Sequence, residues 1–361
     1  MRPKTIADRT VYLRSPSSRM AQPPIKTTVS MTVLAMLFYR SDNNFLYMDR
    51  IALINTTRAI LARAGFDVSS ALTLRGICFD IVARRDAQVL IVKVLSNIDA
   101  FSKENAEEMK VLADSLGATP LVTGERSSSG ALEPGIVYSR FNISIVSNET
   151  LADLLLDEAP PFIFAAPGGL YVKLDSGLLK QAREERGISL GVLAETAGVS
   201  RRTIQMYESG MGAMIDAALR MEEFLELPII EPIDPFTFKS EERMKETREP
   251  PSIEESFALK QLSSLGFTVR PVIKSPFEAV SNSSNAVMLT SLGSDEEKVM
   301  ERAIVASELS RIMDRFSILI VERKHERDNI NSTVVVSNDE LKKMDEPNEL
   351  TDLVAERGTK R

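Results

Sequence analysis

The sequence has very few of the side chains on which many functional sites depend. It contains one cysteine, Cys78, one histidine, His325, and no tryptophan. A single cysteine cannot form a disulfide within the chain, and a zinc site built from cysteine and histidine needs several such ligands. A single histidine also excludes most acid–base sites that depend on this residue. We therefore expect no metal site and no cofactor.

Long hydrophobic runs are also missing. No apolar stretch reaches the roughly 18 residues that a membrane-spanning helix needs, and the sequence shows no glycine-rich phosphate loop and no nucleophile triad. Apolar residues make up 43% and charged residues 26% of the 361 residues, with a net charge of −7. This composition is typical of a soluble protein of two or three domains. We expect a cytoplasmic protein in which any contact with a polyanion depends on a local basic surface.

Residues 1–47 differ from the rest of the chain. A stretch rich in proline, serine and basic residues precedes a short apolar run at 29–39, which superficially suggests a signal peptide. A regular amphipathic pattern begins only at Met48. We therefore interpret 1–47 as a disordered extension or, preferably, as the product of a mis-assigned start codon.

The pattern of residues 176–227 predicts a helix-turn-helix. Apolar residues at helical spacing precede Gly187, Ser189 is a helix N-cap, and a tight turn at 197–199 leads to a second N-cap at Ser200. A third helix is predicted over 201–207. Two short helices joined by a three-residue turn that contains glycine are typical of this motif.

The exposed start of the helix at 201–207 carries side chains suited to DNA. This helix, the third of the domain, is the second helix of the helix-turn-helix motif. In such motifs the second helix lies in the major groove of DNA, while the helix before it crosses the DNA backbone. Arginine can pair with guanine and glutamine with adenine, and the N-terminal amides of helices bind phosphate. Our predicted DNA-binding residues are Ser189, Leu190, Ser200, Arg201, Arg202, Thr203, Gln205 and Met206.

This stretch resembles the Cro/phage-repressor family of helix-turn-helix domains, also called the xenobiotic-response-element (XRE) type. The similarity runs over roughly 50 residues, including Ala197-Gly198-Val199-Ser200 and Tyr207-Glu208-Ser209-Gly210. In that family an arginine of the first helix pairs with the glutamate that ends the third. The resemblance therefore implies a structural pair of Arg183 and Glu208. A helical hairpin that contacts only proteins is the alternative.

Residues 48–160 predict an α/β domain, since helical patterns alternate with short apolar strands. Asp80 on one strand and Lys93 on the next make this domain similar to the restriction-endonuclease-like fold. That fold uses an Asp followed by an acidic-x-Lys motif to hold Mg²⁺. Here Ile91 occupies the acidic position, so an active nuclease is not expected. The alternatives are that Asp80 and Lys93 pair across the strands, that they are solvated on the sheet face, or that an inactive nuclease fold is kept for binding.

The region 250–361 repeats the first α/β domain, and we call the two regions the first and second copy. A predicted helix at 256–265 leads into Gly266-Phe267-Thr268-Val269, which matches Gly65-Phe66-Asp67-Val68. The order of apolar runs then agrees along about 100 residues. At the nuclease-like positions the second copy has Glu278 for Asp80, Leu289 for Ile91 and Ser291 for Lys93. Two copies that lack the full motif favour a scaffolding role.

From Met48 onward the chain resembles archaeal helix-turn-helix transcriptional regulators. We therefore expect an α+β multidomain protein, with an all-α helix-turn-helix of four to five helices at 170–236 between two α/β domains. The expected function is sequence-specific binding of double-stranded DNA by a homodimer, without enzymatic activity. The flanking copies would dimerise or sense a signal. A metal-dependent endonuclease and an adaptor or antitoxin-like protein are the alternatives.

Overall fold

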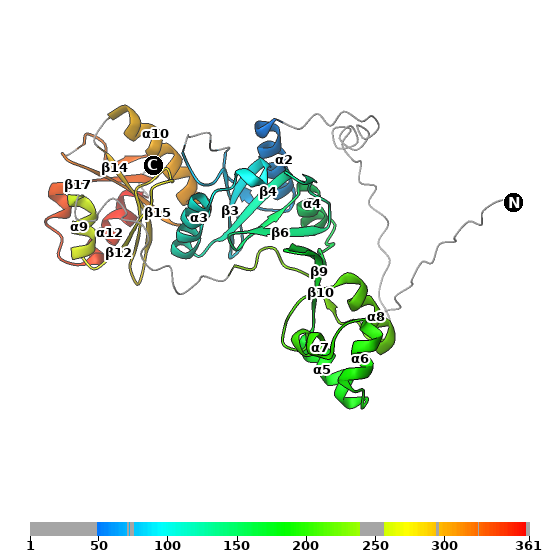
Figure 1. The fold of residues 1–361 in the computed structure, drawn as a ribbon. Coiled ribbons are helices and arrows are strands. Elements are labelled where there is room, and N and C mark those ends of the chain that lie inside the picture. The colour runs from blue at the N-terminus through cyan, green and yellow to red at the C-terminus, as the bar shows by residue number, and fades with distance from the viewer. Residues whose placement is uncertain are drawn as a thin grey trace, which may run out of the picture. The chain divides into compact units, whose positions relative to one another are not determined.

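The computed structural model describes residues 49–70, 72, 76–238, 256–293, 296–323 and 325–358. The segment 1–47, which the sequence marks as an extension, lies outside these residues, and so does the charged stretch at 239–254. The described residues form one compact unit, with elements labelled in Figure 1.

The first copy is a mixed sheet covered by helices on both faces. Ser102 and Ser147 cap its second and third long helices, accepting hydrogen bonds from the amides of Asn105 and Thr150, and Gly117 ends the second helix at φ 63°. Its elements are α2 (Arg50–Arg63), β1 (Asp67–Val68), β2 (Ile81–Arg85), β3 (Gln88–Asn97), the 3₁₀ helix η1 (Ile98–Ala100), α3 (Lys103–Leu116), β4 (Thr119–Ser127), β5 (Gly130–Ala131), β6 (Ile136–Arg140), β7 (Ile143–Val146) and α4 (Asn148–Leu156).

The second copy repeats this topology. Its strand order is β12-β13-β14-β15-β17-β16, and the first copy has β1-β2-β3-β4-β7-β6 with the same sequence of antiparallel and parallel pairs. Its elements are α9 (Phe257–Ser264), β12 (Thr268–Pro271), β13 (Ala279–Asn282), β14 (Val287–Gly293), α10 (Glu296–Met313), β15 (Phe316–Val321), β16 (Asn329–Ile330), β17 (Thr333–Ser337), α11 (Asn338–Leu341) and α12 (Pro347–Gly358).

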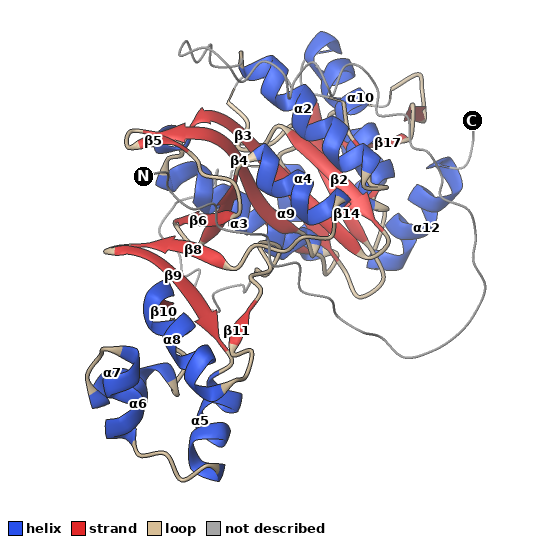
Figure 2. Cartoon of the chain, turned by 90° about the vertical axis from the view of Figure 1, so that its right-hand side faces the viewer, coloured by secondary structure: helices blue, strands red, loops and turns tan. Residues whose placement is uncertain are grey.

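The helix-turn-helix module lies between the copies in sequence and is joined to the first by strands. β8 (Ile163–Ala166) pairs with β6, and β9 (Gly169–Leu174) pairs with β8, with β10 (Ala213–Met214) and with β11 (Ile230–Glu231). Figure 2 shows β8 and β9 following β6 toward the helices. The module's own helices are α5 (Ser176–Glu185), α6 (Leu190–Ala197), α7 (Arg201–Tyr207) and α8 (Ile215–Leu225). The first copy and the module therefore share one continuous sheet.

The two copies share a hydrophobic core. Helix α3 of the first copy packs on β13 of the second, and α10 of the second packs reciprocally on β2 of the first. Hydrogen bonds cross the same contact, including Cys78 N–H to the Lys274 carbonyl at 2.9 Å. The largest buried side chains of this cluster come from both copies, among them Phe79, Ile91, Met109, Phe277, Leu289 and Leu309. The copies are thus packed as an internal pseudo-dimer.

Candidate functional site: the helix-turn-helix surface and the nuclease-like centres

The helix-turn-helix is set by two serine caps and two left-handed glycines. Ser189 accepts a hydrogen bond from the Val192 amide at 3.2 Å, and Ser200 accepts one from the Thr203 amide at 3.1 Å. Gly187 and Gly198 have φ values of 62° and 69°, which a residue with a side chain rarely adopts. These four positions end α5, start α6, turn the chain and start α7.

A buried ion pair braces the module from within. Arg183 of α5 donates to Glu208 at 2.5 Å and 3.0 Å, through Nε and Nη2 respectively. Only 12% of the Arg183 side chain and 8% of the Glu208 side chain are exposed. The hydrogen bond to Glu208 raises the pKa of Arg183 further above its ordinary value. This bidentate pair joins the first helix to the end of α7 and is not available to a ligand.

Helix α7 presents a sharp division between a buried and an exposed face. Ile204 and Tyr207 are buried in the module's core. Arg201, Arg202, Gln205 and Met206 are exposed, and 44% of Met206 is accessible to solvent. Because Arg202, Gln205 and Met206 make no contact with α6 in the described part of the chain, they are the side chains of this short helix best placed to enter a groove of DNA.

The other predicted DNA-binding residues are partly occupied within the module. The hydroxyl of Ser200 contacts that of Thr203 at 2.8 Å, in addition to its capping bond. Leu190 is half-buried against the core. The guanidinium of Arg201 lies over Gly191 of α6, where a Cβ atom would stand 3.1 Å from its Nε and Nη2 atoms. Arg201 therefore contacts the start of α6, a placement that spacing along the sequence does not reveal.

The nuclease-like centre of the first copy contains a buried carboxylate with two cationic partners. Asp80 is 1% exposed and lies within 3.3 Å of Lys93 Nζ and 2.5 Å of Arg50 Nη2. Its other carboxylate oxygen accepts the Val94 amide at 2.8 Å. Ile91, at the position of the acidic ligand, is 1% exposed and packs in the shared core. Every oxygen of Asp80 thus has a protein partner.

Arg50 was missed in the sequence. It is the first residue of α2, and the nuclease-like motif predicts no cation at this position. Burial lowers the pKa of Lys93 from its ordinary value, and the neighbouring Arg50 adds to this, while Asp80 opposes it. A divalent cation at this point would have to displace a bound guanidinium and approach an ammonium group, which Coulomb repulsion disfavours.

The corresponding point of the second copy has the same backbone frame. The Glu278 amide donates to the Thr290 carbonyl at 2.9 Å, as the Asp80 amide does to Val92 at 2.8 Å, and a Glu278 oxygen accepts the Leu292 amide at 2.8 Å. Its cation is Arg302 of α10. Ser291, which replaces Lys93, has a buried hydroxyl without a hydrogen-bond partner in the described part of the chain. Burial raises the pKa of Glu278 above its ordinary value.

Across the described ranges, no group of three or more histidine, cysteine or acidic side chains is arranged to hold a metal ion. Over the same part of the chain, no helix is both long enough and apolar enough to cross a membrane.

Comparison with family models separates the same regions. A model of the PD-(D/E)XK superfamily domain matches residues 50–161, and a helix-turn-helix model matches residues 179–231. The first contains Asp80 and Lys93, and the second contains α6 and α7. No solved structure matches the chain.

Relatives from archaea match along nearly their whole length. A protein of Methanocella arvoryzae is 39% identical over 319 residues, which cover 87% of this chain and 98% of the relative. A protein of Halorubrum lacusprofundi is 38% identical and one of Methanosarcina barkeri 36%, each over 86% of this chain and 98% of the relative. All three carry the name "Putative HTH-type transcriptional regulatory protein". Since identity at this level spans both α/β copies and the helix-turn-helix, the chain belongs to this archaeal family of helix-turn-helix-type transcriptional regulatory proteins.

Proposed function

We propose that the protein regulates transcription by placing α7 in the major groove of double-stranded DNA, with α6 crossing the backbone. The observation that carries this proposal is the exposed face of α7, where Arg202, Gln205 and Met206 project beside two capped helix starts. Arginine and glutamine can each form bidentate contacts with a base, and the methionine can contact a thymine methyl group.

The remaining predicted residues support this contact. The amides that follow Ser189 and Ser200 at the helix starts bind phosphate, since four N–H groups at each helix start lack helical acceptors. Arg201 is held near α6 and pairs with backbone phosphate, while Leu190 and Thr203 position the two helices. In this proposal, Arg202, Gln205 and Met206 contact the bases.

The domain limits are proposed to be 48–160, 170–236 and 250–361, with 1–47 as an extension. One module per chain contacts a single half-site, so specific binding needs a homodimer on two half-sites. The faces of α3 and α10 are already packed between the copies of one chain. A homodimer must therefore use another surface.

We further propose that neither copy is catalytic. In the first copy Arg50 and Lys93 both contact Asp80, and in the second Arg302 contacts Glu278. Incubation of plasmid DNA with the full chain and Mg²⁺ or Mn²⁺ is expected to give no cleavage. Cleavage that disappears in Asp80→Ala would overturn this statement and favour the endonuclease alternative.

The DNA proposal is tested by binding of the full chain to fragments of its own upstream region across a salt series. The variant Arg202→Ala with Gln205→Ala is compared with Arg63→Ala, which removes an exposed arginine at the end of α2. Specific affinity should fall by about tenfold or more in the double variant, at ~1–3 kcal/mol per lost base contact, and stay unchanged in Arg63→Ala. Arg201→Ala should lower the affinity for specific and for non-specific DNA to the same extent. It should also reduce the slope of log affinity against log salt concentration by about one.

Equal binding by the parent and the double variant would contradict the proposed contact. Absence of DNA binding in both would instead support the adaptor alternative, in which the module contacts only proteins.

A further inference from the structure

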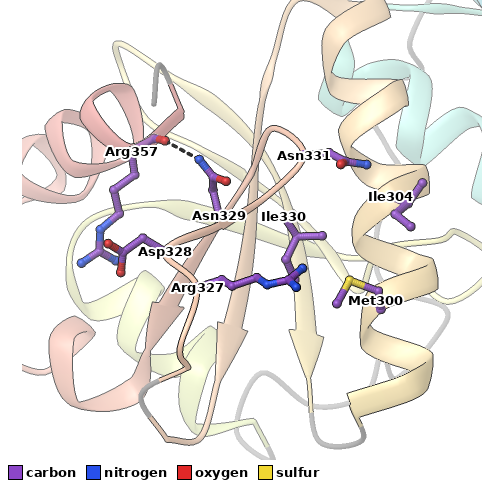
Figure 3. Close-up of a pocket in the computed structure, with 8 residues that line it drawn as sticks. All are labelled: Met300, Ile304, Arg327, Asp328, Asn329, Ile330, Asn331 and Arg357. Carbon is purple, nitrogen blue, oxygen red and sulfur yellow. Dashed lines mark hydrogen bonds between the residues drawn. The ribbon is translucent and has the colours of Figure 1, made fainter. Parts of the chain in front are cut away.

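A cavity of about 600 Å³ opens at the edge of the second copy, between α10 and the hairpin that contains β16. Figure 3 shows its lining residues. Met300 and Ile304 come from α10, and Ile330 comes from β16. Ile304 is 47% exposed, so this apolar wall is accessible to a ligand. The volume lies within the roughly 300–1,000 Å³ usual for small-molecule sites.

An arginine without a side-chain partner stands beside that wall. Arg327 is exposed, and its backbone amide donates to His325 Nδ1 at 3.0 Å. Within the described ranges its guanidinium has neither an ion pair nor a hydrogen bond. In Figure 3 the Arg327 side chain extends toward Met300 and Ile330. The cavity therefore combines an available cation with an apolar surface.

The first copy fills the corresponding space with its own side chains. Its β6–β7 hairpin turns at Phe141 (φ 53°), and the β16–β17 hairpin turns at Asn331 (φ 57°), one residue after the paired strand in both cases. Phe141 packs on Phe101 with ring centroids 6.2 Å apart. Arg140 stacks over Phe141 and pairs with Asp99 at 2.9 Å.

The second copy has Asn331 where the first has the ring of Phe141, and by the register of the two hairpins it has Ile330 where the first has Arg140. Both differences leave the same region open. The turn keeps a left-handed first residue in each copy, and in the first copy the second turn residue, Asn142, is left-handed as well, at φ 61°. The cavity thus arises from specific side-chain replacements on a common frame.

We propose that this cavity binds a small monocarboxylate with an apolar body. Arg327 pairs with the carboxylate, the Asn331 amide donates a second hydrogen bond, and Met300, Ile304 and Ile330 cover the apolar part. Asp328 also lines the cavity, at the side where Arg357 lies in Figure 3. A carboxylate at this place disfavours a polyanion such as nucleic acid, so a single anionic group is the better match.

The test is calorimetric titration of the full chain with hexanoate, octanoate and phenylacetate, and with hexanamide as an uncharged analogue. Two variants change the site in different ways. Arg327→Gln removes the cation, and Asn331→Phe introduces the residue that the first copy carries. Arg323→Gln, an exposed neighbour, is the matched control.

At least one carboxylate should bind the parent and Arg323→Gln equally, and about tenfold or more weakly to Arg327→Gln. Asn331→Phe should abolish binding, and hexanamide should bind at least tenfold more weakly than hexanoate. Circular dichroism checks that Asn331→Phe is folded. Arg327→Gln changes an exposed side chain and decides the question by itself if the other variant does not fold.

No binding of any carboxylate at millimolar concentration would overturn the proposal, as would binding that neither variant weakens. Because the readout is ligand binding in the second copy, the result does not depend on whether α7 contacts DNA.

Discussion

Asp80 and Glu278 occupy corresponding positions in two sheets of the same strand order, yet they acquire their cations differently. Lys93 on the neighbouring strand and Arg50 of α2 contact Asp80. Arg302, from α10, contacts Glu278, and the serine at the Lys93 position makes no hydrogen bond within the described residues. The helix that supplies the cation is thus a different one in each copy.

What both copies keep is the hydrogen bond from the carboxylate to a strand amide, Val94 in the first and Leu292 in the second. A carboxylate that accepts a hydrogen bond from a backbone N–H has a structural role that does not depend on metal binding, because an unsatisfied buried amide is costly. The hydrogen bond to the strand amide is therefore common to the two copies, whereas the cationic partners of the carboxylate differ.

The largest expected effect concerns the core that joins the copies. Cys78 is fully buried, and burial raises its pKa to about 12. At pH 8 the reaction of this thiol with a disulfide reagent should be at least about a thousandfold slower in the native chain than in urea. The reason is that the thiol becomes accessible only when the core between the copies opens, which costs most of the free energy of folding. Rapid labelling in native buffer would show that the copies separate readily.

The next largest effect is expected from Asp80→Asn. Removing the charge leaves the buried Lys93 ammonium without a counter-charge and with only its hydrogen bond to the Ile77 carbonyl, and breaking a buried ion pair in this way costs about 3–5 kcal/mol. Urea unfolding, with midpoint and slope both compared, measures this change. Adding Lys93→Met should restore much of the stability, and a double variant as unstable as Asp80→Asn would contradict the explanation.

Glu278→Gln, the matched change in the second copy, should have a smaller effect that depends on pH. The folded state raises the pKa of Glu278, so the native carboxyl keeps its proton to a higher pH than the unfolded one. Its contribution to stability is full below the ordinary pKa near 4.5 and declines as the pH rises through the raised value. In the glutamine variant, the free energy of unfolding measured from pH 4 upward should not show this decline. An unchanged pH profile would assign the slope to other groups.

The smallest effects are expected from the reciprocal ion pairs at the rim of the contact, Arg270 with Asp114 and Arg311 with Asp67. These side chains are a third or more exposed, so Asp114→Asn and Asp67→Asn should each cost about 1 kcal/mol or less, and less still in high salt. Thermal unfolding at two salt concentrations tests this. A large loss of thermal stability in only one variant would show that the two ion pairs contribute unequally to the contact between the copies.

Local signals in the sequence were sufficient for the helix-turn-helix and for the repeat. The predicted helix at 201–207 has the bounds of α7, because Ser200 and the glycine turn act on their immediate neighbours. The order of strands in the second copy also follows from short apolar runs separated by turn residues.

Features that depend on distant partners could not be predicted in this way. Arg50 and Asp80 are 30 positions apart in the sequence, and Cys78 and Lys274 are nearly 200 apart. Periodic patterns reflect only neighbours in the sequence, so they do not predict these contacts. The sequence patterns do not predict helix α12. The structure shows the hairpin β8–β9, whose pairing with β6 depends on the folded sheet.

That hairpin has a mechanical consequence. Because β8 pairs with β6 and β9 pairs with β8, we expect the module to move with the first copy instead of on a flexible tether. In a homodimer, the rotation about the DNA axis that relates the two modules would then be fixed. Inserting half a helical turn, about five base pairs, between half-sites should then abolish binding, and inserting a full turn should restore part of it.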